Sequence, residues 1–171
     1  MDLSEQDLKK IKSLHVMLKM PIWILERETN RVLKSYKSIY KHPISYEFKE
    51  KNISDEVVRF YSGMLNEIFL CLWYQDVRIV IGAFRINNVT STEFSHVYDN
   101  LTPENKKILS EKECWEYYSS LPVYPLGDIR DYLILLGFLF DMNLEEIYSE
   151  ELHKQVTENQ LELVWKSAED T

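Results

Sequence analysis

The sequence is poor in the residues that mark disulfide-rich, low-complexity or membrane-spanning proteins. Its 171 residues include two cysteines, four glycines and five prolines. Two cysteines cannot build a dense disulfide framework, and so little glycine and proline excludes a low-complexity chain. The uncharged run from Tyr132 to Phe140 is much shorter than the roughly 20 residues of a membrane span. We therefore expect a globular protein with reduced cysteines and no membrane segment.

Motifs for catalysis, cofactor binding and metal binding are also missing. No GxSxG, P-loop, GxGxxG or HExxH pattern occurs, and the four histidines are scattered along the chain. We therefore expect neither an enzyme nor a metal or cofactor site. The chain starts with the polar stretch MDLSEQDLKK, which lacks the apolar segment of an export signal. A cytoplasmic location is the resulting expectation.

Basic residues are in excess only near the N-terminus, and there only slightly. Residues 1–60 carry 12 Lys/Arg against nine Asp/Glu, a balance of +3, whereas eight against 19 leave residues 61–171 at −11. Binding a phosphate backbone needs clustered cations. We therefore do not expect this chain to bind nucleic acid by itself.

Helix and strand signals alternate in the first third of the chain. Ser4-x-x-Asp7 is a capping box before apolar residues at helical spacing, which predicts a helix over residues 4–19. Two β-prone runs, 22–25 and 32–36, flank a turn at 28–30 and predict a hairpin. A short strand at 44–48 and a helix at 55–65, capped by Ser54, are expected to follow.

The strongest strand signal lies in the middle of the chain. The runs 68–74 and 77–86 are apolar on both faces and are separated by Gln75-Asp76, which predicts an antiparallel hairpin in the core of a sheet. Arg85 lies near the end of the second run, and the two-residue period of a strand predicts that it shares a face with Ile79, Ile81 and Ala83. It could bind an acidic group of a ligand, but a solvated position at the strand end is favoured.

Three helices are predicted after a polar connector. The first two begin at Thr102 and Ser110, each of which is a capping residue. The third covers residues 128–140 and is apolar around nearly its whole circumference, which predicts a helix buried in the core. Asp128, Arg130 and Asp131 could form an ionic ligand site, but helix capping and a local salt bridge are favoured.

A narrow apolar seam runs through the C-terminal part of the chain. It predicts a long helix over residues 144–171 that leaves an α+β domain formed by residues 1–143 and pairs with a second copy. The seam residues are Leu144, Tyr148, Leu152, Val156 and Leu163. An antiparallel sheet flanked by helices, with a long C-terminal helix, is typical of PAS- and GAF-like sensor domains, an analogy of fold alone.

Three segments, in this order, carry a resemblance to a known family: PIWILERETNRVLKSY, FLCLWYQDVRIVIGAFRI and YYSSLPVYPLGDIRDYLILLGFLF. Together they resemble the N-terminal regulatory domain of AraC-type transcriptional regulators from Gram-positive bacteria, over roughly residues 10–165. The resemblance implies a sensor or dimerisation module followed by two DNA-binding helix-turn-helix units. Those units are missing from this sequence. We favour a piece of a longer regulator over a regulator that has no DNA-binding half.

The expected function follows from this resemblance and from the pattern of elements. We expect a homodimer that responds to a small-molecule effector and reaches DNA only through a region outside this chain. We expect the effector pocket between the hairpin 68–86 and the helix 128–140, with Trp23, Trp73, Arg85, Tyr118 and Arg130 as lining residues. The alternative is a ligand-free protein-interaction or dimerisation module, which a domain without a cavity would favour.

Overall fold

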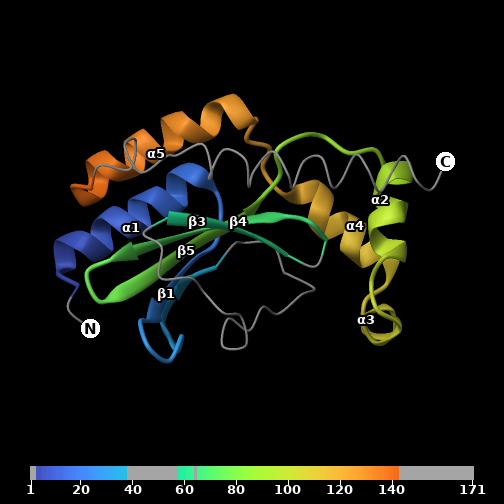
Figure 1. Ribbon diagram of the computed structural model, residues 1–171, viewed down its shortest axis with the longest axis horizontal. Helices are drawn as coiled ribbons and strands as arrows, with labels where there is room; N and C mark the ends of the chain where they lie inside the picture. Colours follow the sequence, from blue (N-terminus) through green and yellow to red (C-terminus); the bar gives the residue numbers. More distant parts are fainter. Residues whose placement is uncertain (1–2, 38–57, 64, 143–171) are drawn as a thin grey trace.

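The computed structural model describes residues 3–37, 58–63 and 65–142 (Figure 1). Over these residues the chain is an α+β protein, as predicted. The expected strand at 44–48 and the expected helix over 144–171 lie outside the described residues. No helix within the described residues is long and apolar enough to cross a membrane. The elements in chain order are α1 (Glu5–Leu18), β1 (Ile22–Glu26), β2 (Val32–Tyr36), β3 (Val58–Ser62), β4 (Ile68–Tyr74), β5 (Val77–Phe84), α2 (Ser91–Asp99), α3 (Pro103–Ile108), α4 (Glu111–Ser120) and α5 (Leu126–Phe140).

The strands of the described residues form one antiparallel sheet in the order β2-β1-β5-β4-β3. β4 and β5 pair around the predicted turn at Gln75-Asp76, with Tyr74 opposite Val77. β1 pairs with the other edge of β5, so the predicted core hairpin lies in the interior of the sheet. Every residue of this hairpin's strands is buried except the half-buried Tyr74. The sheet is therefore covered on both faces.

Strand β3 occupies residues where a helix was predicted. The prediction of a helix at 55–65 is wrong for 58–62, which pair with β4 in antiparallel register. Val58 and Phe60 are buried, whereas Arg59 and Tyr61 are half-buried, which is the two-residue period of a strand. Val58, Phe60 and Tyr61 are β-branched or aromatic, and residues of these types favour a strand here.

Helices α1 and α5 cover one face of the sheet (Figure 1). α1 begins with the predicted capping box, because Ser4 Oγ accepts a hydrogen bond from the Asp7 amide at 3.1 Å and Asp7 Oδ2 accepts one from the Ser4 amide at 3.2 Å. Between the two helices and the sheet lies a mainly aliphatic core. Its members include Ile11, Leu14, Leu18, Ile22, Ile24, Ile79, Ile81, Ile129, Leu133, Leu136 and Phe140.

Helix α5 is a surface helix, and the prediction that it is buried in the core is wrong. Its inner side is buried, but Ile134 is 38% exposed and Phe138 is 89% exposed on its outer side. The helix begins at Leu126 after Pro125 without a side-chain cap, so Asp128 does not cap it. An apolar outer surface hides the normal amphipathic period, and this is why the sequence pattern predicted burial on all sides.

Helices α2 and α4 pack on the opposite face of the sheet, towards one end. α2 lies where the sequence predicted a polar connector, and it starts with a capping box formed by Thr90 and Glu93. Its buried Phe94 contacts the rings of Trp115 and Tyr118, at centroid distances of 5.3 and 5.0 Å. This second core is richer in aromatic side chains than the first.

Candidate functional site

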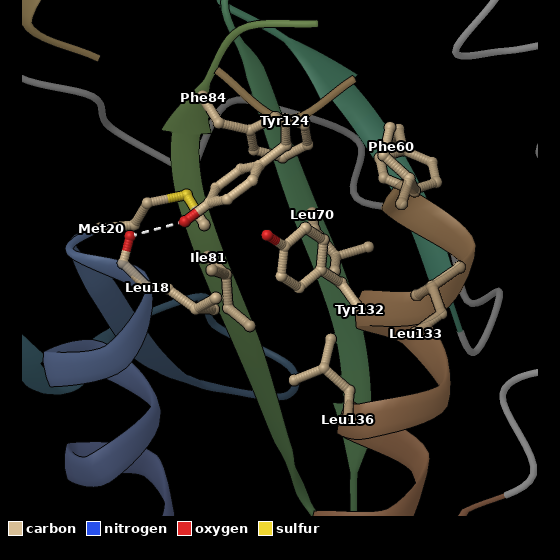
Figure 2. A pocket seen from close by; sticks show the side chains of 11 residues that line it. Leu18, Met20, Phe60, Leu70, Ile81, Phe84, Tyr124, Tyr132, Leu133 and Leu136 are labelled. Atoms are coloured by element: carbon tan, nitrogen blue, oxygen red, sulfur yellow. Dashed lines mark hydrogen bonds between the residues drawn. The ribbon is translucent and has the colours of Figure 1, made fainter. Parts of the chain in front are cut away.

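A cavity of about 30 Å³ lies between the core hairpin and α5 (Figure 2). Its wall combines the end of α1, the strands β3 to β5, the residue Tyr124 before α5, and the inner side of α5. The lining residues are Leu18, Met20, Phe60, Leu70, Ile81, Phe84, Tyr124, Ile129, Tyr132, Leu133 and Leu136. A volume of this size holds about two water molecules. In this conformation the site is a gap in the packing, smaller than a metabolite.

Three aromatic rings lie against one another in the lining of the cavity. The rings of Phe84 and Tyr124 meet edge to face at 5.8 Å, and those of Tyr124 and Tyr132 meet in the same way at 4.6 Å. Edge-to-face contacts of this kind are favourable for aromatic rings. The three rings therefore stabilise one another in the wall of the cavity.

The polar atoms near the cavity belong to neutral tyrosines. The Tyr124 hydroxyl donates a hydrogen bond to the Leu18 carbonyl oxygen at 2.9 Å, and burial raises the pKa of Tyr124 to about 12. Burial, assisted by the carboxylates of Asp128 and Asp131, also raises the pKa of Tyr132. Figure 2 shows the Tyr132 hydroxyl pointing into the space near Ile81. The surface of the cavity is apolar, so the site fits an uncharged, apolar molecule.

The start of α5 is attached to the end of β5. The Arg85 amide donates to the Pro122 carbonyl at 2.9 Å, and the Tyr124 amide donates to the Arg85 carbonyl at 2.7 Å. Further along the helix, Phe140 contacts the Tyr74 ring at a centroid distance of 4.9 Å. α5 is thus fixed by main-chain hydrogen bonds just before its first turn and packs through apolar contacts along its inner side.

The cavity lies where a pocket was expected, but none of the five expected lining residues lines it. Trp23 and Trp73, on β1 and β4, face the opposite side of the sheet, and Tyr118 is buried there on α4. Arg130 is exposed on α5. Arg85 contacts α4. The structure therefore does not assemble these residues into one site, and their role in ligand binding stays a prediction.

Arg85 is buried, and the favoured prediction of a solvated position is wrong. Only 8% of the residue is exposed. Its Nε donates to the Leu121 carbonyl at 3.3 Å, and its Nη2 donates to the carbonyls of Leu121 and Ser119 at 3.0 and 3.2 Å. The guanidinium also lies 5.3 Å from the centre of the Tyr118 ring. Arg85 therefore satisfies carbonyl groups that the end of α4 leaves without helical partners.

A bulge in β5 explains why the predicted face of Arg85 was wrong. Ile68 pairs with Phe84 but Phe69 pairs with Gly82, so Ala83 is an extra residue in the ladder. One extra residue reverses the alternation of side chains beyond it. Gly82 is required at this point, because a Cβ there would lie 2.7 Å from a ring carbon of Phe69 and 3.0 Å from the Ile68 carbonyl oxygen.

The two expected tryptophans take part in other contacts. The guanidinium carbons of Arg78 and Arg27 lie 4.1 and 4.5 Å from the ring centre of Trp73. Trp23 meets Phe69 at a centroid distance of 6.3 Å. These are stabilising cation–π and aromatic contacts. They give both tryptophans a structural role on the second face of the sheet.

Sequence reasoning missed the tyrosines of the cavity. Tyr124 and Tyr132 both lie in the quoted segment YYSSLPVYPLGDIRDYLILLGFLF, on either side of the start of α5. The signal that could have identified them is their spacing of eight residues across a helix start. That spacing brings one ring in front of the helix and the other onto its second turn, so both can face the same space.

The thiols and possible metal ligands of the described residues form no reactive cluster. Cys71 and Cys114 are free and buried in the second core. Burial raises the pKa of Cys71 to about 12 and that of Cys114 to about 11, so both thiols are protonated. Among the described residues, no group of three or more His, Cys, Asp and Glu side chains is placed to hold a metal ion.

Comparison with known proteins adds no family to these observations. No protein-family model, curated protein or solved structure matches the chain. The geometry of the cavity and the sequence pattern are therefore the basis for the function proposed below.

Proposed function

We propose that this chain is the regulatory domain of a bacterial transcription factor, which senses a small ligand and dimerises to control attached helix-turn-helix units. The observation that carries the proposal is the cavity between the core hairpin and α5. The resemblance of three segments to AraC-type regulatory domains supports it, and the helix-flanked antiparallel sheet is compatible with a PAS- or GAF-like sensor. In this proposal the domain is cytoplasmic and has no catalytic activity.

Ligand entry is proposed to move α5 outwards. A cavity of about 30 Å³ has no room for a metabolite, so the binding-competent state must be a more open one. The hydrogen bonds between Arg85, Pro122 and Tyr124 fix the start of the helix, which makes this end the pivot. A ligand then favours the open state by its higher affinity for that state.

The proposed signal leaves the domain through the C-terminal residues. Residues 144–171 follow α5 closely in the sequence and carry the predicted seam of Leu144, Tyr148, Leu152, Val156 and Leu163. A displacement of α5 would change the direction in which this predicted helix leaves the domain. Because paired helix-turn-helix units must match the spacing of two half-sites on DNA, a change in that direction would alter binding.

The proposed ligand is uncharged and mainly apolar. The lining offers aliphatic and aromatic carbon, and the hydroxyl of Tyr124 is already bonded to the Leu18 carbonyl. Burial raises the pKa of both phenols, so each stays a neutral donor at physiological pH. Arg85, the expected partner of an acidic ligand, is instead bound to carbonyl groups at the end of α4. An acidic ligand would therefore meet no cation among the lining residues.

The test combines native mass spectrometry with a substitution that fills the cavity. Leu136→Phe adds ring carbons at the lining and should stabilise the protein by about 1 kcal/mol while preventing retention of a small molecule. Leu135→Phe makes the same change at a half-buried neighbour outside the lining and should retain the ligand. Equal retention by both variants, or a wild-type chain that is a bare monomer, would contradict the proposal.

A second candidate is a ligand-free dimerisation module. The observation that favours it is the exposed apolar surface of α5, where Phe138 is 89% exposed. Exposed apolar patches on a folded domain mark surfaces that bind another protein. A wild-type dimer that carries no added mass, and whose stability does not respond to small apolar compounds, would favour this candidate over the sensor.

A further inference from the structure

The outer sides of α1 and α5 carry most of the exposed apolar surface found in the described residues. Among the described residues, five large hydrophobic side chains are exposed, and four of these five lie on α1 and α5. On α1, Val16 is 66% exposed and Met17 is 61% exposed, and on α5, Ile134 is 38% exposed and Phe138 is 89% exposed. The fifth, Val32, is on the edge strand β2. Exposed apolar side chains that concentrate on two helices over the same face of the sheet need an explanation that single exposed residues do not.

Charges of opposite sign flank the exposed apolar residues of α1 and those of α5. On α1, the exposed Lys12 lies one turn before Val16, and the exposed Lys19 is the C-cap. On α5, the exposed Asp131 lies just before Ile134, and the exposed Asp141 is the C-cap. The outer side of α1 is therefore an apolar centre between lysines, and that of α5 is an apolar centre between aspartates.

The remaining exposed charges preserve this difference. Along α1 and its C-cap, Lys9, Lys12 and Lys19 oppose Glu5, a balance of +2. Along α5 and its C-cap, Asp128, Asp131 and Asp141 oppose Arg130, a balance of −2. The outer side of α1 is therefore positive, that of α5 is negative, and both carry apolar residues. Two α1 surfaces, or two α5 surfaces, would repel each other, whereas α1 and α5 would attract each other.

The arrangement of the helices suits a second copy of the same chain. α1 and α5 lie on the same side of the sheet and run in roughly opposite directions (Figure 1). A two-fold axis between them lays α1 of each protomer on α5 of the other, and each contact occurs twice. We propose that this face is the interface of a homodimer. Val16 and Met17 of α1 then face the outer side of the partner's α5, which carries Ile134 and Phe138.

The two-fold arrangement also predicts which charges meet. The start of α1 lies level with the end of α5, because the Tyr74 hydroxyl binds Asp7 and the Tyr74 ring contacts Phe140. The two-fold axis keeps this alignment, so Lys12 lies nearest the partner's Asp131 and Lys19 lies nearest the partner's Asp128. The inner side of α5 lines the cavity, and its outer side would contact the partner. The interface therefore deepens the proposed function, on whose dimerisation step it rests, because a ligand that displaces α5 would act on the dimer contact.

The first experiment measures dimerisation of the full chain by sedimentation equilibrium. Phe138→Asp should weaken the dimer by at least about tenfold, since it places a carboxylate in the apolar centre beside other acids. Val32→Asp makes the same kind of change at an exposed apolar residue outside the patch and should leave the dimer unchanged. Both positions are exposed, and circular dichroism should show that both variants fold.

The second experiment reverses charges. Lys12→Glu should weaken the dimer, and adding Asp131→Lys in the same chain should restore it. Restoration by the double variant would show a direct contact, which a general loss of stability cannot imitate.

Three outcomes would overturn this interface. They are a wild-type chain that stays monomeric at high concentration, a Phe138→Asp dimer as tight as the wild type, and equal loss of the dimer in Val32→Asp. If Leu152→Glu with Val156→Glu dissociates the dimer and Phe138→Asp does not, the predicted C-terminal helix pairs the protomers instead. Ligand retention by native mass spectrometry then shows separately whether the proposed sensor function survives.

Discussion

The two faces of the sheet are covered in different ways. The face under α1 and α5 is mainly aliphatic and contains the cavity. The face under α2 and α4 contains both cysteines, several aromatic rings and the buried Arg85. Apolar contacts have no preferred direction, whereas hydrogen bonds do. Hydrogen bonds from Arg85 therefore fix the end of α4 on the second face, whereas α5 packs on the first face through apolar side chains along its inner side.

The side-chain hydrogen bonds differ between the helices α4 and α5. Arg85 makes three hydrogen bonds to the end of α4, and the Tyr98 hydroxyl of α2 donates to the Leu109 carbonyl at 2.6 Å. On the first face, the hydroxyls of Tyr124 and Tyr74 bind α1 at its two ends. The middle of α5 packs on the cavity through apolar side chains. We infer that α5, and not α4, is the helix that a ligand can move.

The largest expected effect concerns the packing of α5. Leu136→Ala should lower the free energy of unfolding by about 2–5 kcal/mol, because it removes buried methyl groups and enlarges an existing cavity. Leu135→Ala removes the same atoms from a half-buried neighbour and should cost distinctly less. Urea denaturation measures both. A loss below about 1 kcal/mol for Leu136→Ala would mean that α5 collapses easily onto the gap.

The next effect tests the hydrogen-bonded face. Arg85→Met keeps most of the side-chain volume but leaves the carbonyls of Ser119 and Leu121 without a donor, which should cost about 2–3 kcal/mol. Arg130→Met at the exposed surface of α5 is the matched control and should change stability by less than about 0.5 kcal/mol. If the two variants lose the same stability, the contrast between the faces is wrong.

Short-range signals predicted much of the fold. The bounds of β4 and the turn at Gln75-Asp76 agree with the structure, as do the helix starts at Ser4 and Thr102. Each depends on residues close in sequence, such as a capping side chain and an amide three residues later. α2 could have been predicted in the same way, since Thr90-x-x-Glu93 is a capping box.

Features that depend on distant contacts were not predictable. The bulge at Gly82 exists only because β4 approaches closely, and without it the face of Arg85 was assigned wrongly. Burial of α5 was predicted from its apolar composition, but Phe138 is exposed. A sequence shows which residues are apolar and does not show which elements will cover them.

The candidate site was predictable in position but not in composition. The space between the core hairpin and α5 was expected because both segments are apolar and long. The residues predicted to line this space were charged or large aromatic ones, such as Arg85 and Trp73. In the structure these satisfy helix carbonyls or stack with guanidinium groups. Tyr124 and Tyr132 line the cavity through their position relative to the helix start.

The smallest predicted effect concerns the anchor of α1 on the first face. The Tyr74 hydroxyl donates to Asp7 Oδ1 at 2.9 Å. Burial raises the pKa of Asp7, but the hydrogen bonds from Tyr74 and Ser4 outweigh burial and hold the pKa below the ordinary value of 3.8. Ionised Asp7 therefore stabilises the fold above pH 3.8, and this contribution is lost as the pH falls through the lower pKa of the folded protein.

Tyr74→Phe should therefore destabilise the protein by about 1–2 kcal/mol near neutral pH, and by less as the pH falls below the ordinary pKa of Asp7. Tyr124→Phe is the control, because its hydroxyl donates to the Leu18 carbonyl, which does not titrate, so its cost should not depend on pH in this range. Urea denaturation between neutral and acidic pH measures both, with an NMR titration of Asp7. A pH-independent cost for Tyr74→Phe would show that Asp7 does not anchor α1 through its charge, and the first face would then be held by apolar contacts alone at that end.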